Sequence, residues 1–568
     1  MMASTIGTEA ESDGGVVAAG HPDEVEAGLA MLAAGGNAFD AVVAAAFMGY
    51  VVEPAMCGLG GYGRLSAFRV DRGELIAVDH YLRAPGAARP DMFEIDSAKG
   101  LKYYETPYTQ GLKAERGPLA AAVPGAVAGL YWTQRHLGRL PWRRVLEPAI
   151  AAARAGLEVT WALYMKLAEN EQSLRADPAT AAIFFPQGRL PQPQGQVEPA
   201  ERLALHDLAG TLELIAERGA AGFYAGPVAA AIEETFRACG GILSAADLAA
   251  YRPRVVREAP QRYRDLTYIT CLDPVGYEAL NILDRFDVKA MGPDSLAFRH
   301  VMAEAMAAAF VDNIAFYGDP DAGYAAVAAA LGGRALGDRR AAMIALDRVL
   351  PRPVAAVDPG VEDPTRIGTL LAIDPWPPRL AGTSQMTAAD AEGNMATLLT
   401  SVSHSFGSQI TAAGTGVTLN NGMGNFDPRP GRPNSIAPGK MPIFAVPELI
   451  AVRDGQAVFA ASGSGGYRIT TAILHALTYW HDFGMTLAEA VAAPRLHCQG
   501  KETYLDARIP AAVRDGLAKL GHQIVVQQDD PGLNAFGRIS AVVRRGKLLQ
   551  AVSGPPWLGG AGGHRAGR

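Results

Sequence analysis

The sequence predicts an α+β fold in which antiparallel hairpins alternate with helices in one undivided unit. Strand-like runs flank short turn sequences, as in RLSAFRV and ELIAVDH on either side of 71–73. An apolar run at 41–52 has the length of a buried helix, and a strand, a glycine turn and a helix-like segment follow one another after 456. No Pro/Ser-rich linker, charge block or repeat divides the 568 residues, and their 49% hydrophobic content is enough to bury a large core.

The apolar run at 41–52 carries its own start and stop signals. Asn37 is expected to cap the helix with Asp40 three residues later, and Glu53-Pro54 ends it. The twelve-residue run is too short to cross a bilayer, so we expect a core helix and no membrane partner.

The most informative hairpin lies in GTSQMTAADAEGNMATLLTSVSHSFG, which starts at residue 382. Its turn chemistry is specific, because 391–393 between Asp390 and Asn394 fits a three-residue loop with Gly393 in the left-handed conformation. The turn therefore predicts the register of the two strands that it joins.

Counting outward from this loop places Thr383 opposite Ser401, and a loop different by one residue would present Thr400 instead. In either register Thr383 gains a hydroxyl neighbour. A threonine hydroxyl needs a base within reach to act as a nucleophile. A cut between Gly382 and Thr383 would supply that base, because the new α-amine of Thr383 lies next to its own Oγ1. An ordinary strand threonine is the alternative.

Two glycine clusters give opposite predictions. The GxGxxG match at 58–63 follows a helix and precedes strands, so it lacks the strand-before, helix-after context of dinucleotide binding and is expected to be a tight backbone crossing under the active site. The second cluster, 462–466, follows a hairpin around Asp454-Gly455 and opens a helix from about Arg468. Backbone N–H groups at such a helix start can stabilise an oxyanion.

Motifs in the same order across almost the whole chain resemble those of the gamma-glutamyltranspeptidase family of self-cleaving N-terminal-nucleophile (Ntn) hydrolases. Besides the hairpin at 382, the matching motifs are GGNAFDA (35–41), VVEPAMCGLGG (51–61), VPGAVAGL (123–130), YGDPD (317–321), LNNGMGNF (419–426), SGSGGYRI (462–469) and APRLH (493–497).

The resemblance implies a four-layer αββα sandwich built from two pieces of one precursor, 1–382 and 383–568. It implies cleavage at Gly382–Thr383, with Thr383 as catalytic nucleophile and Ser401 orienting it. Gly465 and Gly466 match the family's pair of oxyanion donors. The partners it implies are a small-molecule amide, water or an amine acceptor, and the two pieces of the precursor itself; no metal or organic cofactor is implied.

The acyl pocket departs from family members that act on glutathione. Asn425 stands where they carry an aspartate for the substrate α-ammonium, and an amide lacks the full charge of that contact. Phe444 and the alanine after it fall near the position where those family members carry a pair of serines. Ser403 stands where they carry an asparagine. Arg89 is the candidate for the α-carboxylate, one position out of the family's register, and Tyr467 follows the glycine pair as a further substrate-binding candidate.

We therefore expect a self-processing threonine amidohydrolase of the gamma-glutamyltransferase or glutathione hydrolase type. The main alternative is an acylase of the same fold for acyl groups without an α-amine, such as glutaryl or oxo-acid amides. The other alternative, from a different class, is an unprocessed, non-catalytic binding protein.

Composition excludes several other classes. A net charge of −7 without a basic stripe argues against nucleic acid. Four scattered cysteines and eleven histidines show no metal-ligand spacing and no disulfide framework. The N-terminal fifteen residues lack a basic n-region and an apolar h-region, so a cytoplasmic location is expected, or a periplasmic one if the natural chain begins earlier. The tail GGAGGHRAGR is expected to be disordered.

Overall fold

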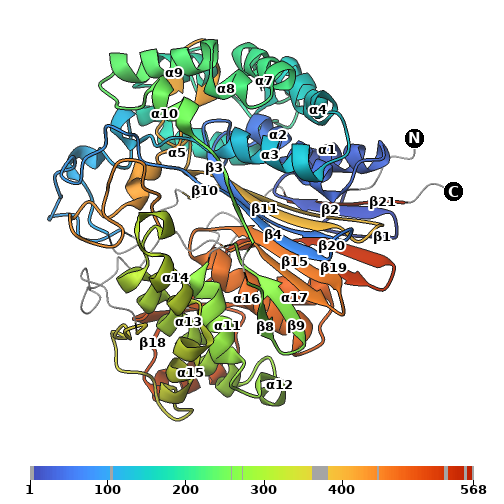
Figure 1. Ribbon diagram of the computed structural model, residues 1–568, viewed down its shortest axis with the longest axis vertical. Coiled ribbons are helices and arrows are strands. Elements are labelled where there is room, and N and C mark those ends of the chain that lie inside the picture. Colours follow the sequence, from blue (N-terminus) through green and yellow to red (C-terminus); the bar gives the residue numbers. More distant parts are fainter. Residues whose placement is uncertain are drawn as a thin grey trace.

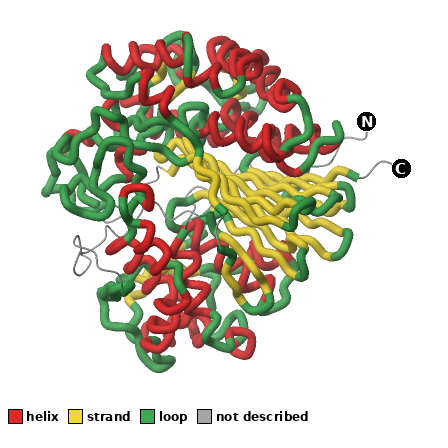
Figure 2. The backbone as a smooth tube through the Cα atoms, viewed as in Figure 1, coloured by secondary structure: helices red, strands yellow, loops and turns green. Residues whose placement is uncertain are grey.

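The computed structural model describes residues 6–102, 106–257, 259–271, 273–360, 381–443, 447–529, 535–554 and 559–565. Two antiparallel seven-stranded sheets lie face to face at its centre, and helices cover the outer face of each (Figures 1 and 2). The fold is therefore α+β with four layers, αββα, as the resemblance implies.

The first sheet carries the hairpin of Thr383 at its centre. Its strands in spatial order are β21 (Gly560–His564), β2 (Gly15–Ala19), β10 (Ala381–Asp390), β11 (Met395–His404), β3 (Tyr62–Arg69), β4 (Glu74–His80) and β7 (Arg254–Val256). The helices of its side of the molecule are α1 (Pro22–Ala33), α2 (Ala38–Val52), α3 (Ala126–Leu137), α4 (Trp142–Ala155), α5 (Trp161–Leu174), α6 (Pro178–Phe184), α7 (His206–Arg218), α8 (Ala221–Tyr224), α9 (Pro227–Ala238) and α10 (Ala245–Ala250).

The second sheet carries the glycine turn. Its strands in spatial order are β1 (Glu9–Ser12), β20 (Leu548–Ser553), β19 (Arg538–Arg545), β15 (Gln456–Ser464), β14 (Leu449–Arg453), β9 (Leu266–Ile269) and β8 (Gln261–Tyr263). The helices of this half are α11 (Pro274–Leu283), α12 (Val288–Met291), α13 (Leu296–Phe316), α14 (Ala325–Leu331), α15 (Arg334–Met343), α16 (Arg468–His481), α17 (Leu487–Ala492) and α18 (Ala511–Leu520).

Three smaller sheets complete the described strands. A three-stranded sheet comprises β16 (Leu496–Cys498), β17 (Glu502–Asp506) and β18 (Gln523–Gln527), and two-stranded sheets pair β12 (Thr411–Ala412) with β13 (Val417–Thr418) and β5 (Leu157–Glu158) with β6 (Arg202–Leu203).

The core divides along the same layers. One apolar cluster joins α1–α4 and α7 to the outer face of the first sheet, and another joins α11, α13 and α16 to the second sheet. A third, thinner cluster lies between the sheets. Hydrogen bonds also cross this interface: Thr387 Oγ1 donates to the Ser540 carbonyl at 2.9 Å and Ser553 Oγ to the Ala19 carbonyl at 3.0 Å.

The predicted core helix is confirmed as α2. Asn37 is its N-cap, with a side chain that accepts from the N–H of Phe39 and Asp40, while the Asp40 carboxylate accepts from the Asn37 N–H. The helix ends at Val52 with Glu53 as its C-cap, and all its residues except Val52 are buried. None of the helices in the described ranges combines the length and apolarity that crossing a lipid bilayer requires.

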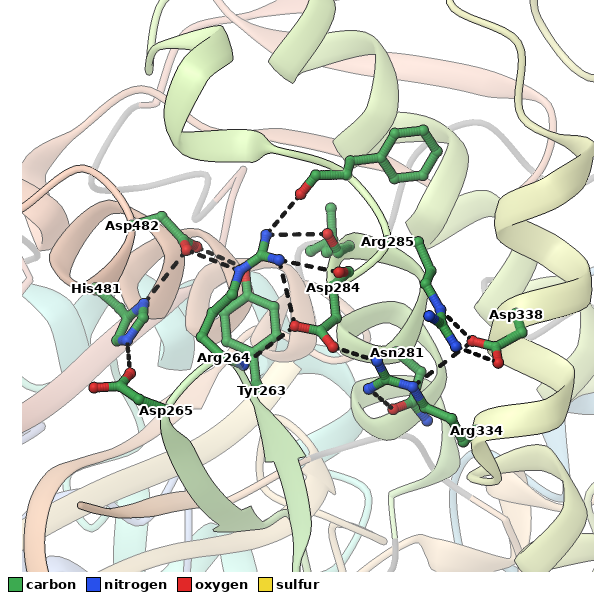
Figure 3. Close-up of polar contacts among 12 residues, drawn as sticks. Tyr263, Arg264, Asp265, Asn281, Asp284, Arg285, Arg334, Asp338, His481 and Asp482 are labelled. Atoms are coloured by element: carbon green, nitrogen blue, oxygen red, sulfur yellow. Dashed lines mark hydrogen bonds and ion pairs between the residues drawn. The ribbon is translucent and has the colours of Figure 1, made fainter. Parts of the chain in front are cut away.

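A polar network joins the edge of the second sheet to its helices (Figure 3). Arg264, in the turn between β8 and β9, donates to the carbonyls of Leu283 and Phe286 just at and after the end of α11. It also pairs with Asp482, at the end of α16. Asp482 in turn accepts a 2.6 Å hydrogen bond from the Tyr263 hydroxyl. Cations near helix C-termini are favourable, so this arginine fixes the edge strands against both helices.

Candidate active site

The β10–β11 hairpin has the predicted turn and register. Gly393 has a φ of 115°, and Asp390 Oδ1 accepts from the N–H groups of Glu392, Gly393 and Asn394. The ladder places Thr383 opposite Ser401, with a bulge between Gly382 and Thr383. The local turn chemistry therefore determines which hydroxyl faces the candidate nucleophile.

Thr383 and Ser401 form a buried hydroxyl pair with an O–O distance of 3.1 Å. Ser401 Oγ donates to the Gly382 carbonyl oxygen at 2.5 Å and accepts from the Ser403 N–H at 2.9 Å. Because Ser401 has one proton, which it gives to Gly382, Thr383 is the donor of the pair. The hydroxyl of Ser401 thus polarises the carbonyl that lies next to the Thr383 side chain.

The glycine turn also matches its prediction. β14 and β15 form a hairpin around Asp454-Gly455, whose φ values of 50° and 75° suit the two-residue turn. β15 ends at Ser464, and α16 begins at Arg468. Between them Gly465 and Gly466 have φ values of 130° and 63°, the region that favours glycine.

The two sheets bring this turn and the strand of Thr383 together. Ser462 Oγ lies 3.4 Å from Thr387 Oγ1 across the sheet interface. Ser384, next to Thr383, donates to Glu24, and Ser464, next to Gly465, accepts from Arg538 at 3.2 Å. The carboxyl groups of Glu53 and Glu24 both act on the charge of Arg538, so the two strand ends share one charge cluster.

Asn425 lies in a short 3-10 turn, Gly422–Asn425, and is 2% exposed. Its Oδ1 accepts from Ser403 Oγ at 3.0 Å, and its Nδ2 lies 3.3 Å from the Tyr81 hydroxyl and 3.5 Å from the Tyr62 hydroxyl. Every described side-chain hydrogen-bond partner of Asn425 is therefore a neutral hydroxyl.

Two further asparagines hold this turn in place. Asn420 Nδ2 donates to the carbonyls of Gly60 and Ala122 at 2.8 and 3.0 Å. Asn421 accepts from the His404 N–H at 2.9 Å and donates to the Glu115 carbonyl at 2.7 Å. The motif at 419–426 thus joins the glycine crossing, β11 and the 115–122 segment around the site.

The first glycine cluster is the predicted backbone crossing. It follows α2 and leads into β3, and Gly60 bridges to Leu419. A Cβ at Gly61 would lie 2.4 Å from the Ser401 carbonyl oxygen, and one at Gly63 would lie 2.3 Å from that of Leu399. The glycines therefore let the backbone pass directly against the strand that carries Ser401.

The remaining substrate-binding candidates are Arg89, Tyr467 and Phe444, and the first two differ in their exposure. Arg89 has a side chain 71% exposed that pairs with Asp91, and no contact among the described residues joins it to Thr383 or Asn425. Tyr467 is buried and packs on Phe310 with a ring-centroid distance of 5.2 Å. Phe444 lies outside the described residues. The structure thus brings together Thr383, Ser401, Ser403 and Asn425, because Ser403 donates its N–H to Ser401 and its hydroxyl to Asn425.

The sequence interpretation missed two groups of residues at the site. Tyr62 and Tyr81 face Asn425 from β3 and from the residue after β4, and nothing in their local pattern distinguishes them from core tyrosines. Glu24 on α1 reaches Ser384 across 360 positions of sequence. Only the pairing of the layers shows either contact.

Two groups of buried side chains in the described ranges have metal-ligand geometry: His300–Glu304–His522 and Glu24–Glu53–Cys57. In the first, Glu304 is paired with Arg352, and His300 Nδ1 lies 2.8 Å from His522 Nε2. The buried polar atoms of the first group are thus paired with one another and with the arginine. The close approach of the carboxyl groups in the second group has no such charge partner within the group.

The chain is similar in sequence to an acylase and to glutathione hydrolases, and in structure to a cephalosporin acylase. The chain is 34% identical over 521 residues to the acylase ACY 1 proenzyme of Pseudomonas sp. (strain V22), covering 90% of this chain and 87% of that one. It is 31% identical to the glutathione hydrolase proenzyme of Pseudomonas sp. (strain A14), with 86% and 82% covered. The crystal structure of cephalosporin acylase from Bacillus halodurans superposes with a TM-score of 0.82 at 26% identity, covering 100% and 98%.

The sequence profile described as gamma-glutamyltranspeptidase matches residues 25–563. This span contains both central hairpins, the glycine turn and the asparagine motif whose geometry is given above. Across almost its whole length, the chain belongs to the gamma-glutamyltranspeptidase family.

Proposed function

We propose that this protein is a self-processing amidohydrolase whose nucleophile is Thr383. The observation that carries the proposal is the triad of Thr383 Oγ1, Ser401 Oγ and the Gly382 carbonyl, joined at 3.1 and 2.5 Å. In the uncleaved chain Thr383 Oγ1 attacks the Gly382 carbonyl, which Ser401 polarises. The peptide bond rearranges to an ester that water hydrolyses, leaving pieces 1–382 and 383–568.

After cleavage the same residues act on an amide substrate. The free α-amine of Thr383 takes the proton from Oγ1 as the hydroxyl attacks the substrate carbonyl. The Gly465 and Gly466 N–H groups stabilise the oxyanion of the tetrahedral intermediate. The α-ammonium of Thr383 then gives its proton to the nitrogen of the scissile bond, and the substrate's amine leaves. Water hydrolyses the acyl-enzyme, or an acceptor amine takes the acyl group.

For the acyl group, we propose a preference for chains without an α-ammonium. Support comes from the neutral environment of Asn425, whose side chain contacts Ser403, Tyr81 and Tyr62. Two described carboxylates of the neighbouring segments are already paired, Glu115 with Lys102 at 2.8 Å and Asp427 with Arg429 at 2.7 Å. A substrate ammonium would therefore lose water without gaining a counter-charge. The similarity to an acylase agrees with this preference.

The second candidate is hydrolysis or transfer of γ-glutamyl groups, which the similarity to glutathione hydrolases favours. Release of the aniline from γ-glutamyl and glutaryl anilides separates the two candidates. Faster turnover of the glutaryl substrate supports the proposal, and faster turnover of the γ-glutamyl substrate supports the second candidate.

Two threonines of β10 provide the control for the nucleophile. Thr383→Ala should abolish turnover of every anilide, while Thr387→Ala, which removes a hydroxyl on the same face of the same strand, should leave it measurable. A wild-type protein inactive on an amide panel would favour the non-catalytic binding protein instead.

A further inference from the structure

A buried pair of carboxyl groups lies directly behind the nucleophile strand. Glu24 on α1 is fully buried, and Glu53 at the end of α2 is 8% exposed. Ser384 Oγ donates to Glu24 Oε1 at 3.1 Å, and the His21 N–H donates to Glu24 Oε2 at 3.1 Å. Because side chains alternate along a strand, Ser384 faces this pair while Thr383 faces the opposite side of the sheet.

The backbone around Glu24 is shaped to admit its carboxyl group. A Cβ at Gly49 would lie 2.3 Å from Glu24 Oε1. A Cβ at Gly20 would lie 2.6 Å from Ser384 Oγ and 3.1 Å from Glu53 Oε2. Any side chain at either glycine would displace the carboxyl groups, so the niche depends on two positions without a side chain.

The geometry requires a proton in this niche. Glu53 Oε2 is buried without a hydrogen-bond partner among the described residues. Burial raises the pKa of Glu24 well above its usual range, and the adjacent charge and hydrogen bond of Glu53 raise it further. Two adjacent buried carboxyl groups cannot both ionise, so they hold one proton between them.

Among the described residues, the groups whose charges act on the pair are Tyr50, Cys57 and Arg538, and His21 adjoins it at the start of α1. Burial raises the pKa of both Tyr50 and Cys57, so the two side chains stay neutral. Burial lowers the pKa of Arg538, and the charges of Glu53 and Glu24 oppose that shift. Arg538 Nε in turn donates to Ser464 Oγ at 3.2 Å, immediately before the glycine turn.

We propose that Glu24 is a positioning residue for the nucleophile, which it holds by accepting the hydroxyl proton of Ser384. The inference rests on the proposed role of Thr383. Glu24 fixes the strand at the residue after Thr383, and the charge of Arg538 ties the same cluster to the residue before Gly465. Contacts behind the site thereby set the distance between the nucleophile and the oxyanion donors. A displacement of the reacting groups by about 1 Å can cost about 10²-fold in rate.

A divalent cation is the alternative occupant of the niche, since Glu24, Glu53 and Cys57 have ligand atoms within 4.8 Å of one another. The positive charge of Arg538 acts on the same two carboxyl groups and disfavours a second cation there. The structure therefore assigns a shared proton to the pair.

The experiment compares Glu24→Ala, Glu24→Gln, Ser384→Ala and the Glu24→Ala/Ser384→Ala double variant on an anilide substrate. Both alanine variants should lower kcat about tenfold with KM within about twofold, and the double variant should be no slower than either, because both remove one hydrogen bond. Glutamine still accepts from Ser384 and donates to Glu53, so Glu24→Gln should retain kcat at neutral pH. It should also retain kcat above the raised pKa of Glu24, where the wild type loses the shared proton, the two carboxylates repel one another and kcat falls.

A second buried carboxyl pair supplies the matched control. Glu278 on α11 adjoins Asp312, and Arg340 pairs with Asp312, in the helical layer of the other sheet. Glu278→Gln should leave kcat, KM and the fall of kcat above the raised pKa of Glu24 as they are in the wild type. A purely structural effect of altering a buried carboxyl pair would appear in both sets of variants.

Wild-type kcat in Glu24→Ala and Ser384→Ala would overturn the inference, and so would fully multiplicative losses in the double variant. A stoichiometric metal in the purified protein would replace the shared proton and overturn it as well. If the wild type cleaves no amide, the proposed function fails instead. The inference then stands or falls on unfolding: wild-type stability should fall as pH rises from the ordinary pKa of a glutamate toward the raised pKa of Glu24, and Glu24→Gln should remove that fall.

Discussion

Changing Asn425 to aspartate tests the acyl pocket with a single charge. The substitution keeps the shape of the side chain, whose Oδ1 accepts from Ser403 and whose Nδ2 faces Tyr81 and Tyr62. The two tyrosine hydroxyls can turn to donate to a carboxylate, so three hydroxyls would solvate the new charge. Lys102 Nζ, 2.9 Å from the carbonyl of the preceding residue, favours it further.

The magnitude follows from the contact that the charge creates. A hydrogen bond between the carboxylate and a substrate ammonium contributes about 1.5–3 kcal/mol, and about 1.4 kcal/mol is tenfold in kcat/KM. Asn425→Asp should therefore shift the ratio of kcat/KM for γ-glutamyl over glutaryl anilide by roughly ten- to a hundred-fold toward γ-glutamyl. The negative charge should slow the glutaryl substrate by repelling its carboxylate.

The assay measures aniline release from both substrates by wild type, Asn425→Asp and the uncharged Asn425→Leu. The leucine variant should lower kcat/KM for both substrates without shifting their ratio toward γ-glutamyl, because it removes the amide and adds no charge. An unchanged ratio in Asn425→Asp would show that this side chain does not face the acyl group, and the account of the pocket would be refuted.

Three other predictions concern the oxyanion turn, the glycine crossing and pH. Gly465→Val or Gly466→Val should lower kcat by about 10²–10³ with little change in circular dichroism; turnover within a few-fold of wild type in both would remove the oxyanion role. Gly61→Ala should cost about 1–3 kcal/mol in urea unfolding, because its Cβ would lie 2.4 Å from a carbonyl of β11; an unchanged midpoint would contradict that contact. Burial lowers the pKa of His80 and of His404 from 6.5 to about 4. Stability present above pH 6.5 should therefore fall as pH drops toward 4, by about 1.4 kcal/mol per pH unit for each histidine, and a flat profile would contradict the neutral state of both side chains.

The parts of the fold that the sequence predicted correctly are those set by local chemistry. The three-residue loop with Gly393 determined the pairing of Thr383 with Ser401, and Asn37 with Asp40 determined the start of α2. In both cases the decisive contacts join residues within a few positions of one another or follow from a turn by counting. The αββα layering and the placement of the glycine turn came from the family resemblance.

The glycine-rich tail was predicted wrongly. Its residues 560–564 form β21, which pairs with β2 at the edge of the first sheet. A Cβ at Gly562 would lie 2.6 Å from Leu29 Cδ1, so the glycines let α1 pack closely on this edge strand. A strand whose side chains are absent to make room for a helix has no hydrophobic pattern, and composition alone suggests disorder.

The site residues that sequence analysis missed depend on contacts between layers. Glu24 meets Ser384 only because α1 packs behind β10, and Tyr81 meets Asn425 only because β4 and the asparagine turn converge. Arg89 shows the opposite case, since it matches the family nearly in register but its side chain is 71% exposed. Register along the chain did not place that side chain in the pocket.

The most direct test of the central claim is the mass and N-terminal sequence of the purified protein's pieces. The account predicts two pieces, with the smaller beginning at Thr383, and a single uncut chain for Thr383→Ala. Thr387→Ala should cleave at the same bond. A Thr383→Ala protein that still cleaves between Gly382 and residue 383, or a wild type whose smaller piece begins elsewhere, would contradict the assignment of Thr383 as the nucleophile.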